Sequence, residues 1–296
     1  SLFSAESEWV TRSETLPSMK LNHWHDVRDW YRGFLDAGLR ADVVPLAYDW
    51  TGYKTIVLPT VLSLSDEDVL RIADFAKAGG TVIVGYAAGL IDEHFHIGLG
   101  GYPGAGNGLL RDMLGIRSEE FNILGEEAEG ELSEISLSNG LTTRLWQNDV
   151  TSVAADTTVL ASYAGESAAD WELERTPAIT SRPYGNGTAI YVGCDLNRHD
   201  IAQLLKALGS RWQELSAQPT ESGQTPTYPT TDPRILHTIR RSADGSTRFD
   251  FYLNRSNQPV AINGVEGDPI IAHRCETDAV GYTLNRNAIL IAKTSC

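Results

Sequence analysis

Two short runs of apolar residues, 53–59 and 81–86, flank a segment with the spacing of an amphipathic helix. Both runs are continuous rather than alternating, which is typical of strands that are buried on both faces. Ser65 and Asp68 predict a capping box at the start of the helix, and Gly79 and Gly80 predict its end, with one glycine in the left-handed region. Because strand, helix and strand follow one another closely, we expect a parallel sheet with helices on both faces.

The residues around this unit extend the pattern. Apolar residues recur at helical spacing from Trp24 to Leu39, Gly38 closes that helix, and residues 41–46 predict a short strand. The predicted fold class is therefore α/β, a flavodoxin-like doubly wound domain of the class I glutamine amidotransferase-like type, over residues 23–215. Beyond Tyr86 we expect a Gly-rich segment at 87–108, a helix at 109–114, strands at 132–137, 142–146, 158–163, 178–182 and 188–192, and a helix at 200–208.

A change of composition separates a second domain. Residues 216–233 are rich in Ser, Thr, Pro and Gln, which is typical of a linker. Beyond them, strand-like runs at 235–240, 248–254, 259–262, 279–283 and 288–292 alternate with turn residues. We therefore expect a small antiparallel β domain over residues 234–296, after the linker.

Charge restricts the partners. The 296 residues include 24 Lys and Arg against 39 Asp and Glu, a net charge of −15. Nucleic acids and anionic membranes repel such a chain, so neither is expected as a partner. The longest apolar runs fall well short of the roughly 20 residues that span a bilayer.

The three cysteines, Cys194, Cys275 and Cys296, are widely spaced and odd in number. They form neither a disulfide framework nor a CxxC zinc motif. No secretory signal is recognised at the start, where Ser1 to Ser4 lead directly into the polar Glu6. These features favour a cytoplasmic location.

The glycines between Gly98 and Gly108 precede a predicted helix, as in loops that cradle phosphate groups. No Gly-Lys-Ser/Thr sequence follows, and no strand leads directly into the glycines. A surface loop is favoured, and no cofactor is expected.

Asp92, Glu93, His94 and His96 bring metal-binding side chains together, with the two histidines alternating along an extended segment. The spacing supplies no third ligand of a typical site. We therefore expect no bound metal.

Cys194 follows a predicted strand, and Asp195, Asn197 and His199 lie nearby. A thiol at a strand-to-helix turn is the nucleophile in class I amidotransferase-like folds. Such a turn requires a glycine two residues after the nucleophile, where this chain has Leu196. The pattern favours a buried, unreactive cysteine, although a free-standing amidotransferase-like enzyme or small-molecule-binding module remains an alternative.

Acidic clusters are the other candidates for chemistry, because paired carboxylates hydrolyse glycosides. Asp66, Glu67 and Asp68 are explained by helix capping and the helix dipole. Glu126, Glu127 and Glu129 lie in a Gly-flanked loop and are expected to be solvated. We assign no catalytic residue.

Aromatic residues in the β domain allow a further alternative, a carbohydrate-binding module. The candidate sugar platforms are Phe249, Phe251, Tyr252 and Tyr282. Aromatic residues on strands are more often part of a core.

Residues 89–93, 96–104 and 110–121 resemble the non-catalytic middle domain of glycoside hydrolase family 42 β-galactosidases. Shorter matches follow in the same order as in that family, at 41–45, 53–59, 78–84, 177–180 and 185–193. Residues 1–22 resemble the family's exit from its catalytic barrel, and residues 234–296 have the position and β character of its C-terminal domain. The stretch from Gly106 to Gly108 departs from the family as a small insertion.

The resemblance implies a role in assembly. In this family the middle domain mediates trimerisation, and both catalytic glutamates lie in a barrel that precedes it and needs about 200 residues or more. None of the carboxylates here maps to those roles. We therefore interpret the chain as the trimerisation and C-terminal domains of a β-galactosidase, whose partners are further copies of itself in a homotrimer and the catalytic barrel. Within residues 1–212, we expect the segment 87–108 to supply trimer contacts through Ile91, Phe95, Ile97, Leu99 and Tyr102.

Because no carboxylate pair maps to the catalytic positions, we expect the purified 296-residue chain to leave a chromogenic β-galactoside intact. Release of the chromophore is measured against a buffer blank, with an active β-galactosidase as the positive control. Turnover above the blank would show that the catalytic groups lie within these residues.

Overall fold

The strand–helix–strand unit predicted at residues 53–86 is present as β3 (Thr55–Leu58), α3 (Asp66–Lys77) and β4 (Thr81–Gly85). The two strands pair in parallel, from Thr55 opposite Thr81 to Leu58 opposite Val84. The Ser65 hydroxyl accepts a hydrogen bond from the Asp68 amide at 3.1 Å, and the Asp68 carboxylate accepts one from the Ser65 amide at 3.3 Å. The predicted capping box is therefore confirmed.

The computed structural model describes residues 1–13, 20–123, 134–165, 173–215, 232 and 234–295. The chain divides into two units. The first comprises Ser1–Gly33 and Ala41–Leu204, and the second comprises Phe34–Arg40 and Leu205–Cys296. Among the described residues, no helix is long and apolar enough to cross a membrane.

The main sheet of the first unit has seven strands in the order β3-β4-β11-β10-β9-β6-β7. The strands that follow β4 are β11 (Gly187–Val192), β10 (Pro177–Tyr184), β9 (Thr158–Ala164), β6 (Ile135–Leu137) and β7 (Thr142–Thr143). Among the described strands of this sheet, only β3, β4 and β11 are parallel to one another, and the remaining neighbours are antiparallel. The sheet is thus mixed, and the flavodoxin-like doubly wound architecture that we predicted is not confirmed as a whole.

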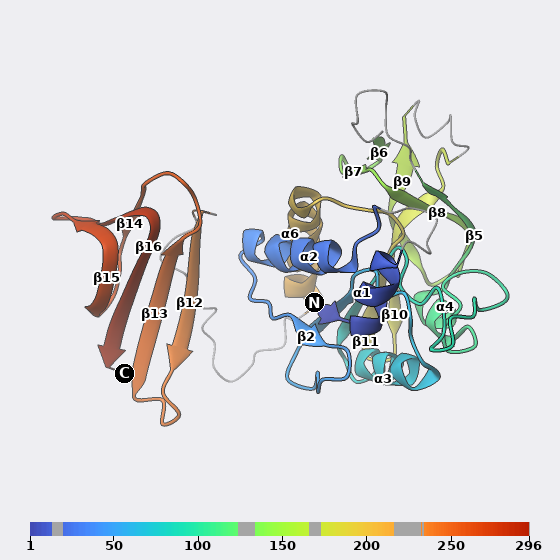
Figure 1. Ribbon diagram of the computed structural model, residues 1–296, viewed down its shortest axis with the longest axis horizontal. Helices are drawn as coiled ribbons and strands as arrows, with labels where there is room; N and C mark the ends of the chain where they lie inside the picture. The colour runs from blue at the N-terminus through green and yellow to red at the C-terminus, as the bar shows by residue number, and fades with distance from the viewer. Residues whose placement is uncertain (14–19, 124–133, 166–172, 216–231, 233, 296) are drawn as a thin grey trace. The chain divides into compact units, whose positions relative to one another are not determined.

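Helices cover both faces of the parallel strands. Val82 and Val84 of β4 share a core cluster with residues of α3 and of α4 (Leu109–Leu114). On the other face lie α2 (His23–Asp36) and α6 (Arg198–Leu215), which pack so closely that a Cβ on Gly33 would clash with Ile201. Figure 1 shows α2 and α6 on the opposite side of the strands from α3.

Several elements of the first unit differ from the prediction. The strand expected at 41–46 is reduced to β2 (Val44–Pro45), which pairs with β1 (Leu2–Phe3) outside the main sheet and precedes no crossover in it. The structure adds β5 (Ile116–Ile123), which pairs with β8 (Trp146–Val153) as a separate antiparallel sheet. A short helix, α1 (Ala5–Arg12), follows β1. The polar sequence of β5 gave no strand signal, because its Arg, Ser and Glu residues interrupt the apolar alternation.

The second unit contains the expected antiparallel β domain. Its sheet runs β12 (Ile235–Arg241), β13 (Thr247–Asn254), β16 (Gly281–Ser295) and β14 (Val260–Asn263), and β15 (Asp268–Thr277) pairs along β16. The two strands predicted at 279–283 and 288–292 form one long strand. Sequence patterns missed β15, because most of its side chains are exposed and show no apolar alternation.

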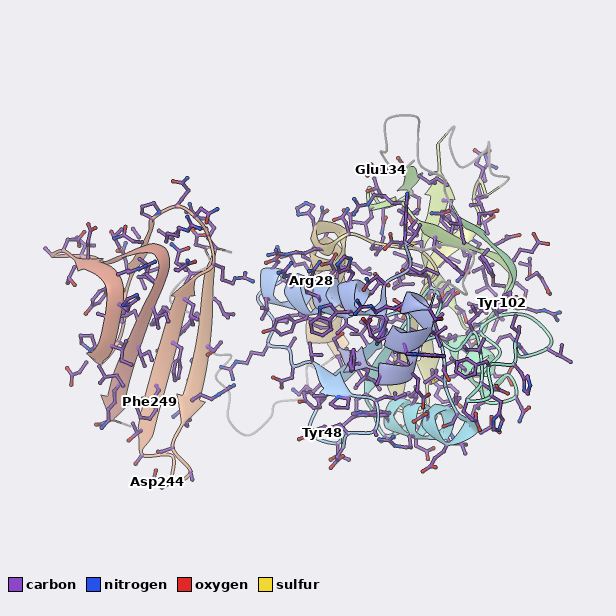
Figure 2. The ribbon with its side chains drawn as sticks, viewed as in Figure 1. Arg28, Tyr48, Tyr102, Glu134, Asp244 and Phe249 are labelled. Atoms are coloured by element: carbon purple, nitrogen blue, oxygen red, sulfur yellow. The ribbon has the colours of Figure 1, made fainter. Side chains whose placement is uncertain are left out.

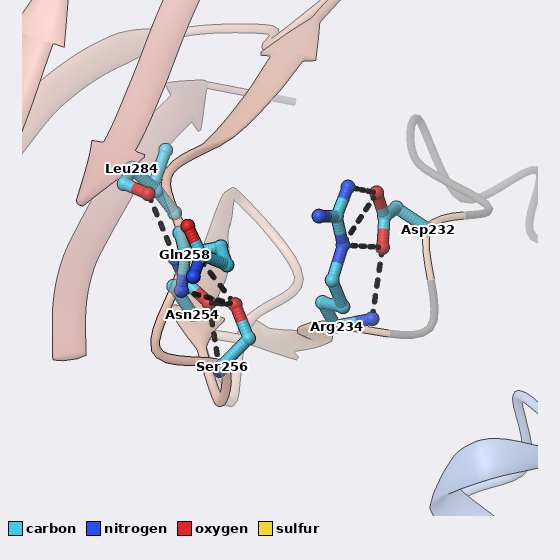
Figure 3. A network of polar contacts seen from close by, with 6 residues as sticks. All are labelled: Asp232, Arg234, Asn254, Ser256, Gln258 and Leu284. Atoms are coloured by element: carbon cyan, nitrogen blue, oxygen red, sulfur yellow. Dashed lines mark hydrogen bonds and ion pairs between the residues drawn. The ribbon is translucent and has the colours of Figure 1, made fainter. Parts of the chain in front are cut away.

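The buried Asn254 ties the turn after β13 to the neighbouring strand (Figure 3). Its Nδ2 donates to the carbonyl oxygen of Gln258 at 2.7 Å and to that of Leu284 at 2.8 Å. Its Oδ1 accepts from the amide of Ser256 at 2.8 Å. These bonds satisfy backbone groups that the β13–β14 turn would otherwise leave unpaired.

The end of α3 leads to a test of helix termination. Gly79 has φ +113°, and a Cβ there would meet no atom closer than 4.0 Å, so backbone conformation alone resists a side chain. We expect Gly79→Ala to lower the free energy of unfolding by about 1 kcal/mol. Gly52→Ala, at an open position without positive φ, is the matched control and is expected to be near neutral. Equal denaturation midpoints for the two variants would disprove the left-handed cap.

Candidate functional site

Three parallel strands end side by side beneath α2, and the residues that follow them form a polar cluster. Thr60 follows β3, Tyr86 follows β4, and Asp195 follows β11. α2 adds Asp26. In open α/β sheets, ligands bind outside the carboxyl ends of the parallel strands, so this edge is the natural place to look for chemistry.

Hydrogen bonds hold both carboxyl groups. Oδ2 of Asp26 accepts from the hydroxyl of Thr60 and, at 2.7 Å, from the phenol of Tyr86. Oδ2 of Asp195 accepts from the amide of Leu145 at 3.4 Å. Each donor comes from a different connection of the sheet, so the cluster requires the assembled unit.

Burial and like charge shift the pKa values of the groups in this cluster. Burial, and then the negative charge of Asp195, raise the pKa of Asp26. Burial is also the main cause that raises the pKa of Asp195. The pKa of Tyr86 lies well above its ordinary value, because its phenol is buried and donates to the Asp26 carboxylate. Raised values of this kind mean that the neutral forms are favoured at the site.

A very small cavity lies between these groups. It is lined by Asp26, Trp30, Tyr86, Cys194 and Asp195, together with apolar residues of β11 and α6. The volume of the cavity is about 10 Å³. That is room for about one water molecule, whereas pockets for organic ligands are typically about 300–1,000 Å³. The arrangement can hold a proton or a water molecule, and it cannot admit a sugar.

Cys194 lies in this cluster and is almost fully buried, at 1% exposure. Burial, and then the charge of Asp195, raise the pKa of its thiol. Nearby, the phenol of Tyr163 donates to the Gly193 carbonyl at 3.1 Å, which holds the backbone before the cysteine. A buried thiol that stays protonated is a poor nucleophile, which disfavours the amidotransferase-like alternative.

The glycine loop before α4 folds back on itself. A Cβ on Gly98 would lie 2.7 Å from Cα of Gly104, so these glycines permit contact between two turns of backbone. The amides of Gly104 and Ala105 both donate to the Gly89 carbonyl at 3.2 Å. Close packing within the loop explains these glycines, without a phosphate.

The Asp92 loop uses its carboxylate internally. Oδ1 of Asp92 accepts from the amides of His94 and His96, each at 2.8 Å, and these bonds keep the pKa of the carboxyl low. The two imidazole rings are 6.1 Å apart between centroids. Across the described residues, no group of three or more His, Cys, Asp or Glu side chains is placed to hold a metal ion.

The remaining candidates are scattered. Asp66 and Asp68 occupy the first turn of α3, as expected from capping. Glu126, Glu127 and Glu129 lie outside the described residues.

In the β domain, Tyr252 is buried with its ring stacked on His237 at 4.3 Å between centroids, and Tyr282 packs against the core. Phe249, labelled in Figure 2, and Phe251 are half-buried on β13, so they provide no open aromatic platform.

Sequence patterns missed Asp26, Thr60 and Tyr86. A signal was present for each of them. Asp26 lies one helical turn before Trp30, on the face that α2 buries, and a carboxylate on such a face needs a partner. Thr60 and Tyr86 directly follow predicted parallel strands, where functional side chains gather in this class of sheet.

The burial of Cys194 leads to a test with thiol reagents. In a Cys275→Ser/Cys296→Ser background, we expect the remaining Cys194 thiol to resist an aromatic disulfide reagent near neutral pH, since the thiolate is disfavoured and inaccessible. The denatured protein, labelled under the same conditions, is the control for full reactivity. Rapid stoichiometric labelling of the native protein would contradict the buried placement.

Two family models match the chain in succession. The β-galactosidase trimerisation domain of glycoside hydrolase family 42 matches residues 1–216, and the β-galactosidase C-terminal domain of the same family matches residues 235–294. β-Galactosidase BbgII of Bifidobacterium bifidum is 36% identical over 294 residues, which are 99% of this chain and 40% of that protein. A β-galactosidase of an Arthrobacter species is 30% identical over 92% of this chain and 35% of its own length.

Solved structures agree at the level of fold. The β-galactosidase of Bacillus circulans sp. alkalophilus superposes with a TM-score of 0.76 at 22% identity, covering 99% of this chain and 41% of that one. The chain thus spans about 40% of the length of its relatives. The matched models and the relatives together show that the chain belongs to the glycoside hydrolase family 42 β-galactosidases, of which it comprises the trimerisation domain and the C-terminal domain.

Proposed function

We propose that this chain is the assembly part of a β-galactosidase, which holds catalytic barrels together as a homotrimer. In its full-length form the enzyme hydrolyses terminal β-D-galactosides, and the chain described here contributes no catalytic residue. The family's trimerisation domain and the β-galactosidases among the relatives support this role. So does the size of the cavity at the strand ends, which is too small for a sugar.

An exposed apolar surface carries the proposal. Four residues, Trp9, Phe95, Ile97 and Leu99, form what we call the assembly patch, and their exposures are 66%, 52%, 56% and 93%. The rings of Trp9 on α1 and Phe95 on the loop lie 6.2 Å apart between centroids. A cluster of large apolar side chains left open to solvent marks an interaction surface.

The other two residues expected at the contact have a different role. Ile91 and Tyr102 are half-buried and pack against a core cluster that includes Leu62 and Trp146. Tyr102 is also tied to Ser118 by two backbone hydrogen bonds, of 2.6 and 3.0 Å. These residues anchor the base of the loop, while Phe95, Ile97 and Leu99 are left for a partner.

The loop that carries the patch is held in shape before any partner arrives. Besides the Asp92 bonds described above, the amide of Asp92 donates to the His96 carbonyl at 3.0 Å, and Ile91 bridges Ile97. A preformed surface loses less conformational entropy on association. We infer that the patch is a trimer contact of defined geometry.

Charge opposes the association. A net charge of −15 on each chain repels further copies, so a stable contact needs apolar burial on the order of 1,000 Å² or more. Salt screens this repulsion within about 10 Å at 0.1 M. We therefore expect assembly to strengthen as the ionic strength rises.

The domain boundaries and the location of the enzyme are part of the same proposal. Residues 23–215 are assigned as a flavodoxin-like trimerisation domain, supported by the parallel strands β3, β4 and β11 with helices on both faces. Residues 1–22 are assigned as the exit from the catalytic barrel, 216–233 as a linker, and 234–296 as the C-terminal β domain. We place the enzyme in the cytoplasm.

Substitution in the patch tests the contact. We expect light scattering to show a mass that rises with concentration towards three chains, and Leu99→Asp to weaken the association at least tenfold, since burying a leucine contributes about 1.5–3 kcal/mol. Leu70→Asp, the same change at an exposed leucine of α3, is the matched control. A wild-type chain that stays monomeric at high concentration and high salt would remove the assembly role.

A further inference from the structure

Two carboxyl groups from distant parts of the sequence line one small, partly open cavity, and both side chains are half-buried. Asp26 of α2 and Asp195, which follows β11, line the same cavity with Trp30, Tyr86 and Cys194. Two carboxylates confined together do not both ionise readily, because each charge opposes the other and burial opposes both. The trimer contact proposed above does not use this pair, and neither does the packing of the core.

The hydrogen bonds distinguish the two acids. Asp26 accepts from two neutral hydroxyl groups, those of Thr60 and Tyr86. Asp195 accepts from a backbone amide, that of Leu145, and the positive charge of Arg144 favours its ionised form. Asp195 is therefore the better anion, and Asp26 is the better place for a proton.

Within the described residues, the charges that shift the pKa values of the pair are those of Asp29 and Arg144 and of the two acids themselves. From α2, Asp29 adds a negative charge, and its own ion pair is with Arg28, at 3.7 Å. His23, also on α2, is buried, and this lowers its pKa to about 4, so it is neutral near pH 7. Tyr86 after β4 and Cys194 after β11 are neutral as well, since burial raises the pKa of each. Arg144, before β8, compensates one carboxylate.

We propose that Asp26 and Asp195 hold one shared proton near neutral pH, and that this proton locks α2 onto the carboxyl ends of β3, β4 and β11. Removing the proton at alkaline pH leaves two negative charges in a space with room for about one water molecule. α2 then separates from the strand ends. The shared proton therefore makes the first unit less stable at alkaline pH, independently of whether the chain forms trimers.

The sign of the pH dependence follows from linkage. Both carboxyl groups have pKa values raised above that of an unfolded aspartate, which is about 3.9. The folded unit therefore binds a proton that the unfolded chain has lost, and the resulting stability is present at low pH and is lost as pH rises through the folded value. His23 acts in the opposite sense, because its lowered pKa costs stability as pH falls below about 6.5. The amino group of Ser1 acts in the same sense as His23 up to about pH 8, because burial lowers its pKa to about 6. The contribution of the carboxyl pair is therefore measured as the difference between the wild-type chain and Asp26→Asn.

Thermal and denaturant unfolding between pH 6.5 and 9, followed by tryptophan fluorescence, test the proposal. Asp26→Asn imitates the protonated acid and keeps the other titrating groups. We expect the folding equilibrium constant of the wild-type chain, divided by that of Asp26→Asn, to fall with pH by up to tenfold per pH unit, as for one proton released, so that Asp26→Asn is the more stable protein at pH 9. Asp74→Asn on α3, a 72%-exposed aspartate, is the matched control and is expected to keep the wild-type slope.

A second measurement covers the case in which Asp26→Asn does not fold. Infrared difference spectra of the wild-type chain between pH 6.5 and 9 are expected to show the loss of one protonated carboxyl band, and Asp195→Asn is expected to abolish that loss in this range. A ratio of the wild-type to the Asp26→Asn folding constant that does not change with pH, or a spectrum without a protonated carboxyl band at pH 6.5, would each overturn the proposal.

Discussion

The burial of β4 on both faces is the constraint on which the rest of the first unit depends. Val82, Ile83 and Val84 are fully buried, with β3 on one side and β11 on the other. Such a strand needs helices above and below it, and the capped helix α3 covers one face while α2 and α6 lie on the other. Because α2 must cross the ends of the strands to do so, it brings Asp26 to the polar residues that follow them.

The same packing explains why the candidate site is small and neutral. A crevice at the carboxyl ends of parallel strands normally receives a ligand. Here the side chains of Trp30, Leu196 and Ile201 help to fill the crevice, and the space that remains holds about one water molecule. Cys194 stands where an amidotransferase-like fold would present its nucleophile, yet it is buried and its thiol pKa is raised. Side chains therefore fill the strand ends, and the space that remains cannot admit a sugar.

The interaction surface that we propose lies on segments outside the sheet. The assembly patch lies on α1 and on the loop after β4, where the exposed Trp9 and Leu99 contrast with Ile91 and Tyr102, which pack inward. Internal hydrogen bonds of Asp92 hold the loop, so its carboxylate supports the shape of the patch. A loop of this kind combines an anchored base with an apolar tip, which suits contact with another subunit.

The sequence by itself determined the local elements whose signals lie within a few residues. The capping box of Ser65 and Asp68, the glycine stop after α3, the buried strands β3 and β4 and most strands of the β domain follow from caps, turn residues and apolar runs. Short motifs in order also identified the family. Tertiary structure alone decided that the polar β5 is a strand, because its partner β8 is distant in sequence. Apolar patterns also did not give the antiparallel direction of β9 and β10 or reveal the exposed β15, although β10 and β15 pair with strands that follow them closely in sequence. Tertiary structure likewise decided the candidate site: the local signals of Asp26 and Asp195 do not relate the two residues, and they meet only because α2 and the end of β11 pack against the same sheet edge.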